Sequence, residues 1–368
     1  MMRAASEPTA DARRYARIRY RLLIDHLASW FAFLGAFLWW GGSHATARWW
    51  SDHVPTEPLR LLGYVAAVSS AYYLLMFPLH AYGSFHLEHR FGLSRLTAWA
   101  WLKREVKQLA VSAVLGASLI EGLYALLRHA PASWPLWATF GWVMFNIVLT
   151  RVFPTILLPI FYKTSLLQDD ALVTRLLALC QRVGLTALGV FRFDLGAETR
   201  KANAALAGLG KTRRVLLSDT LLAEFTPEEI EGVLAHELAH HRYHHITKML
   251  LLSAIGSWLA FTLTQTISHH WVAALGLHSL ADLAGFPMLM RTLSALGLIG
   301  LPLQNAISRA FEWQADRFAV DMTNRTTAFA AALRRLAALN LADPHPPRWA
   351  TWLFYDHPPI TQRIEAAE

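Results

Sequence analysis

Residues 231–253 read EGVLAHELAHHRYHHITKMLLLS, and this stretch joins two kinds of sequence. Its first half is polar and rich in histidine. Its second half opens the apolar run 246–267, which is long enough to cross a bilayer as a helix. The stretch therefore predicts a histidine-bearing helix that leads into a membrane span.

The composition of the whole chain is that of a polytopic membrane protein. Hydrophobic residues make up 54% of the 368 residues and charged residues only 16%, with a mean hydropathy of +0.29. We therefore expect a mostly α-helical membrane bundle of about six to seven spans. The segments that are long and apolar enough to span are 22–42, 61–82, 108–127, 134–153, 246–267 and 286–307.

Basic residues alternate between the two sides of these spans. They are frequent before the first span, where Arg3 begins the series, between the second and third spans, and across residues 163–245. The loops at 43–60 and 268–285 carry few or none. The positive-inside rule places both termini and the 163–245 region in the cytoplasm. Because the net charge of +8 follows this topology, a nucleic-acid-binding protein is disfavoured.

The first span allows a second interpretation. The Arg-rich tail, the apolar run and Ala45-Thr46-Ala47 resemble a signal peptide with its cleavage site. A run of about 20 residues is long enough to remain in the bilayer, so we favour an uncleaved anchor.

Between residues 163 and 245 the pattern is that of a soluble segment. Residues 169–184 have helical periodicity, with Gly184 as the expected stop. KANAALAG (201–208) and RRVLLSD (213–219) resemble two strands joined by a glycine-containing turn. We expect a small β-sheet here.

Residues His236-Glu237-Leu238-Ala239-His240 form an HExxH pattern. On a helix, positions four apart share a face, so both imidazoles can reach one Zn²⁺. Glu237 lies beside them, where a carboxylate can act as general base on a water that the ion polarises. Thr226-Pro227-Glu228-Glu229 predicts the capped start of this helix. The alternative is an accidental match among 17 histidines, or a solvated helix end near lipid headgroups.

A zinc site needs a third protein ligand. Glu312 and Asp316 in FEWQADR (311–317) are four residues apart and share a helix face. Glu312 is the candidate ligand, and Asp316 is the candidate partner that orients an imidazole through its free N–H. The alternative is a pair of surface carboxylates near Arg309 and Arg317.

Two histidines compete with Glu312 for this role. His244 lies two turns after His236, and His241 follows the motif directly. We rank both lower, because three ligands on one straight helix surround a tetrahedral ion poorly.

With these motifs in hand, the chain resembles the integral-membrane zinc metalloendopeptidases of the CAAX prenyl protease type I family. The resemblance covers most of the chain and keeps the family's order of motifs. The matching stretches are EHRFGLSRLTAWAW (88–101), LPIFYKTSLLQDDAL (158–172), KANAALAGLGKTRRVLLSDTLL (201–222), HELAHH (236–241), FEWQADRFA (311–319) and HPPITQRI (357–364).

The resemblance implies His236, His240 and Glu312 as ligands of one Zn²⁺ per chain, and Glu237 as the base. It also implies a zincin-like peptidase domain on the cytoplasmic side. We expect residues 1–153 to form a transmembrane region of four spans. Residues 154–368 would hold the peptidase domain, two further spans and a C-terminal cytoplasmic segment.

Further site residues come from the resemblance alone. It implies that Asn203 and Ala204 lie on an edge strand where the substrate backbone pairs. It adds His357 and Arg363 to the catalytic residues, with His357 as a candidate donor to the tetrahedral oxyanion. The alternative for His357 is a simple turn before the last helix, and His345 is a weaker candidate in a similar stretch.

The leading hypothesis is a zinc-dependent membrane endopeptidase of a bacterial inner membrane. It would cleave peptides or lipidated proteins at a cytoplasm-facing cavity. A broad-specificity quality-control protease of the heat-shock type is the alternative among enzymes. A membrane scaffold with a structural zinc is the non-enzymatic alternative, and it would not need Glu237.

Glu121 lies within the third predicted span. Ionisable residues in spans usually face a protein interior or water. It either lines a chamber or forms a hydrogen bond with a neighbouring helix.

Overall fold

Six long apolar helices dominate the structure, a computed structural model that describes residues 10–208 and 210–368. Residues 1–9, which include Arg3, and residue 209 lie outside the described residues. Each long helix contains all or nearly all of one predicted span, which confirms the expected helical membrane bundle. Their bounds are Ala10–Trp39, Glu57–Arg90, Ala98–His129, Trp134–Phe161, His245–Ala274 and Leu283–Thr323.

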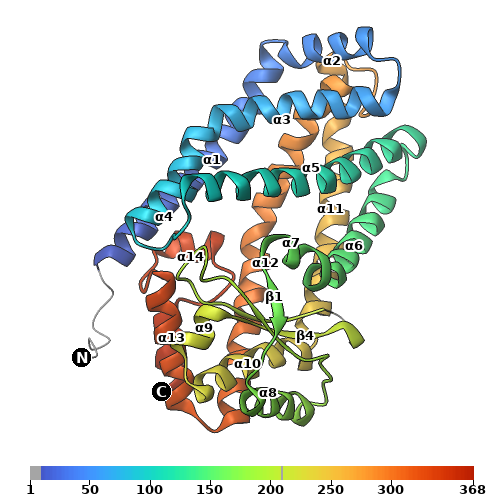
Figure 1. Cartoon of the computed structure of the whole chain (residues 1–368). Helices are drawn as coiled ribbons and strands as arrows, with labels where there is room; N and C mark the ends of the chain where they lie inside the picture. The colour runs from blue at the N-terminus through green and yellow to red at the C-terminus, as the bar shows by residue number, and fades with distance from the viewer. Residues whose placement is uncertain (1–9, 209) are drawn as a thin grey trace.

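These helices and a few short ones form the bundle (Figure 1). Two π-helical turns, at Tyr82–His86 and Phe153–Leu157, join pairs of helices end to end. In chain order the bundle helices are α1 (Ala10–Trp39), α2 (Gly42–His53), α3 (Glu57–Ala81), α4 (Leu87–Arg90), α5 (Ala98–His129), α6 (Trp134–Val152), α7 (Leu158–Phe161), α11 (His245–Ala274) and α12 (Phe286–Thr323).

The predicted first span, 22–42, has different limits in the structure. α1 starts well before residue 22 and ends at Trp39, ahead of a reversal into α2. Gly41 makes this reversal with a φ of +73°, in the left-handed region that glycine adopts without a steric penalty. The basic first turns of α1 therefore extend beyond its apolar part.

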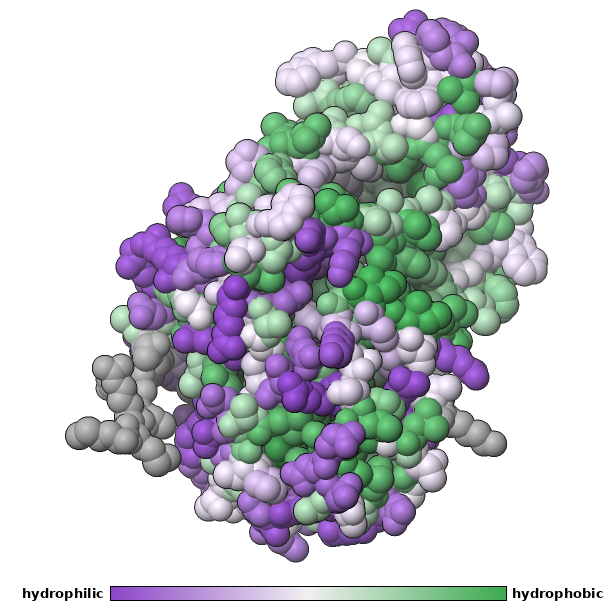
Figure 2. All heavy atoms as spheres, in the orientation of Figure 1, coloured by the Kyte–Doolittle hydropathy of each residue, from purple (hydrophilic) through white to green (hydrophobic). Residues whose placement is uncertain are grey.

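The bundle buries few of its apolar side chains in protein. Tyr64, Tyr124 and Trp134 are fully buried where α3, α5 and α6 meet. Glu121 Oε1 is also buried and has no hydrogen-bond partner among the described residues. Figure 2 shows apolar side chains gathered over part of the bundle surface, whereas hydrophilic ones collect around the sheet. Such an apolar surface is stable in lipid.

A four-stranded sheet lies at the end of the molecule opposite α2 (Figure 1). Its strand order is β1-β2-β4-β3, with β2 parallel to β4 and the other pairs antiparallel. The strands are β1 (Thr164–Leu166), β2 (Val190–Phe193), β3 (Ala204–Ala207) and β4 (Arg214–Ser218).

The predicted pair of strands, 201–208 and 213–219, is confirmed as β3 and β4. Ala204 lies opposite Leu217 and Ala207 opposite Arg214. Gly208 turns the chain between them with a φ of +96°, and a Cβ there would lie 2.5 Å from a backbone oxygen. β1 and β2 were not predicted, because strands of three or four residues carry too little periodicity.

Five helices share a core with this sheet, namely α8 (Asp170–Arg182), α9 (Asp219–Glu224), α10 (Pro227–Arg242), α13 (Thr326–Asn340) and α15 (Ile360–Ala367). The short helix α14 (Arg348–Phe354) packs against α12 instead. α8 matches the predicted helix 169–184, and Gly184 follows its end with a φ of +75°. The shared core places Leu217 of β4, Leu234 of α10 and Phe329 of α13 in one buried cluster.

The histidine-bearing helix and the following span are two helices rather than one. α10 ends at Arg242, and α11 begins at His245. His244 between them has a φ of +57°, so the chain changes direction there. The predicted helix leads into the span as expected, but through a break that removes His244 from the face that carries His236.

Candidate metal centre and active site

The first turn of α10 is closed by local hydrogen bonds. The Thr226 side chain accepts from the Glu229 backbone N–H at 3.3 Å, and Glu229 Oε2 accepts from the Thr226 N–H at 2.8 Å. This is the predicted capping box. Ile230, Leu234 and Leu238 then face the core, so the opposite face of α10 is presented to α12.

Three side chains from α10 and α12 converge on one point. His236 Nε2 lies 3.3 Å from Glu312 Oε2, and His240 Nε2 lies 3.3 Å from Glu312 Oε1. The two imidazole Nε2 atoms are 3.2 Å apart. One ligand atom from each residue lies within 4.8 Å of the others, so a single ion can reach all three.

The surroundings of these groups favour a cation. Glu312 Oε2 is buried and has no hydrogen-bond partner among the described residues. Burial opposes a charge on His236, but the carboxylates of Asp316 and Glu312 raise its pKa to about 9. Burial lowers the pKa of His240 to about 4, so its imidazole is neutral at pH 7, as a metal ligand must be. Two imidazoles and a carboxylate at this spacing fit a metal ion.

Asp316 holds the imidazole of His236. Its Oδ1 lies 2.8 Å from His236 Nδ1, which leaves Nε2 directed at Glu312. Arg363 binds both carboxylate oxygens of Asp316, at 2.8 Å from Nε and 2.7 Å from Nη2. Both residues are buried. Arg363 therefore reaches the site mainly through Asp316.

His245 holds His240 in a similar way. His245 Nδ1 lies 3.1 Å from His240 Nδ1, and His245 Nε2 lies 2.9 Å from Gln314 Oε1. The ring of His245 also stacks on Phe311, with centroids 4.3 Å apart. This contact could not be predicted from the sequence, because it depends on the break at His244, which turns His245 back towards the motif.

Glu237 lines a cavity of about 250 Å³ together with His236, His357 and Arg363. Burial raises the pKa of the Glu237 carboxyl above its usual range. The cavity wall also includes Asn203 and Ala204. The structure thus brings the sequence-predicted site residues of α10, α12, β3 and the C-terminal segment to one place.

β3 is the last strand of the sheet, and its outer edge faces this cavity. The Asn203 carbonyl accepts from the Ser218 N–H at 3.0 Å, on the side of β4. By the alternation of an antiparallel pair, the N–H and C=O of Ala204 point the other way. His241 Nε2 lies 3.1 Å from the Leu206 carbonyl, so this rival ligand contacts the strand instead of the three converging side chains.

His357 approaches the same three side chains from the C-terminal segment. Its Nε2 lies 3.2 Å from Glu312 Oε2, and its Nδ1 lies 2.8 Å from Asp356 Oδ1. Burial opposes a charge on His357, but Asp356 and Glu312 raise its pKa overall. His345 lines a different cavity, beside Arg309 and Arg348.

Two family models together match almost the whole chain. A model described as peptidase family M48 matches residues 167–368. A model described as the CAAX prenyl protease N-terminal region, with five membrane helices, matches residues 4–163. Within residues 4–163, the structure has four helices that are long enough to span a membrane, together with the shorter helix α2.

Known proteins are similar over most of their length. A Bacillus subtilis protein described as an uncharacterized metalloprotease, YhfN, is 26% identical over 98% of this chain and 85% of its own. CAAX prenyl protease 1 of Saccharomyces cerevisiae is 25% identical over 86% of this chain and 74% of its own. The crystal structure of S. mikatae Ste24p has the same fold, with a TM-score of 0.89 at 22% identity, covering 100% of this chain and 91% of that chain.

These matches agree with the family that the sequence motifs resemble. The M48 model alone covers more than half of the chain, including both histidines of the HExxH pattern and Glu312. The chain therefore belongs to peptidase family M48 and is an integral-membrane metalloendopeptidase.

Proposed function

We propose that this protein is a zinc-dependent endopeptidase whose ion is held by His236, His240 and Glu312. Two imidazoles and one carboxylate, with a position left for water or substrate, are the donor set of catalytic zinc sites. The convergence of these three groups beside Glu237 is the observation that carries the proposal. When bound, the ion polarises the attacking water and the scissile carbonyl.

Glu237 acts as the general base. Its carboxylate takes a proton from the attacking water and returns it to the amine that leaves. Burial raises the pKa of this carboxyl above its usual range. A raised pKa makes a carboxylate a better base at pH 7.

His357 and Arg363 have different roles in this proposal. His357 Nε2 faces the cavity from the side of Glu312, where an N–H can donate to the oxyanion of the tetrahedral intermediate. Arg363 positions Asp316, which in turn orients His236. Arg363 Nη2 also lies 3.8 Å from Glu312 Oε2, so it acts on the site both through Asp316 and directly.

The substrate backbone pairs with the outer edge of β3. Ala204 offers an N–H and a C=O on that edge, directly beside Glu237. Adding a strand fixes an extended peptide without reading every side chain. Asn203 lies next to this point and contributes to the same wall.

The named relatives and the charge pattern support a substrate class and a location for this proposal. Several similar proteins are named CAAX prenyl protease 1 or its homologue, so we propose lipidated C-terminal peptides as substrates. We place the site and both termini on the cytoplasmic side of a bacterial inner membrane. The proposed boundary between the transmembrane region and the peptidase domain lies at residues 153–154.

The test is cleavage of a farnesylated CAAX-ended peptide and its unlipidated twin by the detergent-purified protein. Wild type is run beside Glu237→Ala, with zinc content measured in both. Glu237-dependent cleavage that prefers the lipidated peptide supports the proposal. Equal cleavage of both peptides favours broad membrane-protein proteolysis. Bound zinc with no cleavage of either peptide contradicts the proposed activity on lipidated peptides.

A further inference from the structure

A second cavity of about 730 Å³ adjoins the cavity of Glu237. The two share the walls formed by Ala337, Ala342 and Ile360. The two cavities are therefore adjacent, and a chain held at Glu237 lies beside the second cavity. A cavity of this size has room for a short peptide segment.

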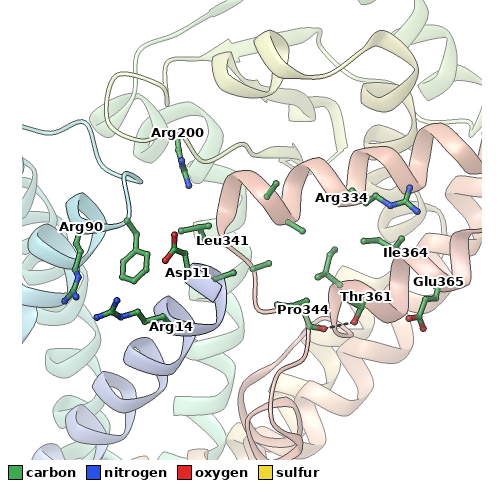
Figure 3. Close-up of a pocket in the computed structure, with 16 residues that line it drawn as sticks. Asp11, Arg14, Arg90, Arg200, Arg334, Leu341, Pro344, Thr361, Ile364 and Glu365 are labelled. Atoms are coloured by element: carbon green, nitrogen blue, oxygen red, sulfur yellow. Dashed lines mark hydrogen bonds between the residues drawn. The ribbon is translucent and has the colours of Figure 1, made fainter. Parts of the chain in front are cut away.

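Three arginines gather at one end of this second cavity. Figure 3 shows Arg14, Arg90 and Arg200 around the same end, with Asp11 between them. Among the described residues none of the three arginines forms an ion pair, and Arg200 Nε is buried without an acceptor. Arg334 lines the other end and pairs with Glu368. Among the residues that line this end of the cavity, Asp11 supplies the negative charge, and the three arginines supply a larger positive charge.

The segments that carry Arg90 and Arg200 are joined by the backbone. The Arg200 N–H donates to the Leu93 carbonyl at 3.1 Å, and Ser94 pairs with Thr199 in an isolated β-bridge. The Thr199 hydroxyl adds a hydrogen bond of 2.7 Å to Leu93. These bonds fix the backbone of the two segments relative to each other, so the side chains of Arg90 and Arg200 project from neighbouring, fixed positions.

The rest of the cavity is apolar. Leu341, Ile360 and Ile364 form part of its wall, with Leu341 near the arginines and Ile364 near Arg334 (Figure 3). A ligand that suits such a cavity combines an apolar body with one anionic end. The C-terminal end of a peptide with apolar side chains has this character.

The direction of β3 connects the two cavities. Arg200 precedes Ala204 by four residues on the same segment. A peptide paired antiparallel to β3 runs with its C-terminus towards Arg200. At about 3.3 Å per residue, this separation corresponds to roughly 13 Å of extended chain. A peptide with only a few residues after the cleaved bond would end at the arginines.

We propose that Arg14, Arg90 and Arg200 form a subsite for the C-terminal carboxylate of the substrate. This inference rests on the proposed function, because it assumes that the scissile bond lies at Glu237. Guanidinium groups bind carboxylates through charge-assisted hydrogen bonds. The subsite thus selects for cleavage a few residues from a free C-terminus, and Asp11 weakens it.

The test compares two peptides that differ only in a C-terminal carboxylate or carboxamide. Wild type is expected to cleave the carboxylate form with kcat/KM about tenfold higher, mainly through KM. Arg14→Gln, Arg90→Gln and Arg200→Gln should each reduce this ratio towards one, whereas Asp11→Asn should increase it. Arg13→Gln, on the same helix but outside the cavity, is the matched control. If a variant that carries all three Arg→Gln substitutions keeps the wild-type ratio of kcat/KM for the two peptides, the proposal is wrong.

A binding measurement separates this inference from the proposed function. Fluorescent versions of both peptides are titrated onto Glu237→Gln, which does not require turnover. Tighter binding of the carboxylate form, lost with the arginines, supports the subsite even if no cleavage is found. The same titration is repeated with vesicles of anionic phospholipid. If the arginine variants change vesicle binding but not the peptide ratio, the site is for lipid headgroups and the proposal is wrong.

Discussion

Helices α10 and α11 are separated by only two residues, yet they are stabilised by different surroundings. Ten of the 16 residues of α10 are buried within the protein. Only three of the 30 residues of α11 are buried, and its most apolar window contains none of them. α10 packs against α12, α13 and β3, whereas α11 packs against α6 and α12 and leaves most of its side chains on the apolar outer surface.

This difference explains where the catalytic groups lie. A metal centre needs ligands and hydrogen-bond partners held from several directions, and α10 has packed neighbours that supply them. α11 exposes most of its length on the apolar surface. It contributes His245 to the centre, because the position of this residue at the first turn lets it contact both α10 and α12.

Removal of the metal should have the largest effect. Dialysis against a chelator should abolish peptide cleavage, and added Zn²⁺ should restore it. Far-UV circular dichroism should change little, because the spans are stabilised by lipid or detergent rather than by the ion. Glu312→Gln should reproduce the loss without chelator, with metal content as the readout. Full cleavage by protein that contains no metal would contradict this prediction.

Glu237→Gln should remove catalysis while α10 keeps its contacts. We expect kcat to fall about 10²- to 10⁴-fold, as for loss of a general base. Metal content should stay at the wild-type level, because Glu237 is outside the group of three converging side chains. Loss of metal in this variant would show that Glu237 has a ligand role instead.

Leucine truncation should distinguish the two helices directly. Leu234 on α10 is 1% exposed, and Leu251 on α11 is 61% exposed. Leu234→Ala should cost about 2–5 kcal/mol of folding free energy through the cavity that it creates. Leu251→Ala leaves no cavity, because lipid fills the space, and should have a much smaller effect. Thermal unfolding in one detergent measures both, and equal shifts in Tm would refute the comparison.

The hydrogen-bond partners of the two imidazoles should give the smallest effects. Asp316→Asn and His245→Ala should each weaken metal binding about 10- to 100-fold, as partners of metal-bound histidines do. Competition with a chromophoric chelator measures this affinity. His278→Ala changes an exposed histidine that does not belong to the metal centre, so this control variant is expected to keep the wild-type metal affinity. Wild-type affinity in His245→Ala would show that α11 contributes nothing to the centre.

The parts of the site that could be predicted depend on spacing along one helix. His236 and His240 share a face of α10, and Glu312 and Asp316 share a face of α12, because both pairs are four residues apart. The strands β3 and β4 could be predicted because a glycine-containing turn separates two apolar runs. Each of these signals lies within a short window of sequence.

The parts that could not be predicted depend on contacts between distant segments. His245 and Gln314 are 69 residues apart, and their hydrogen bond has no local signature. Arg14 and Arg200 line one cavity although they come from opposite halves of the chain, and no local sequence pattern indicates that they meet. The strands β1 and β2 gain their stability from pairing with each other and with β4.

The sequence by itself determined six apolar runs, the capped start of α10 and the two pairs of ligand-type residues. These features follow from local hydrophobicity and helical periodicity, which need no knowledge of the rest of the chain. Only the tertiary structure decided that Glu312 rather than His241 or His244 meets the two histidines. That choice depends on how α12 packs against α10 and on the break at His244, and both arise from long-range packing.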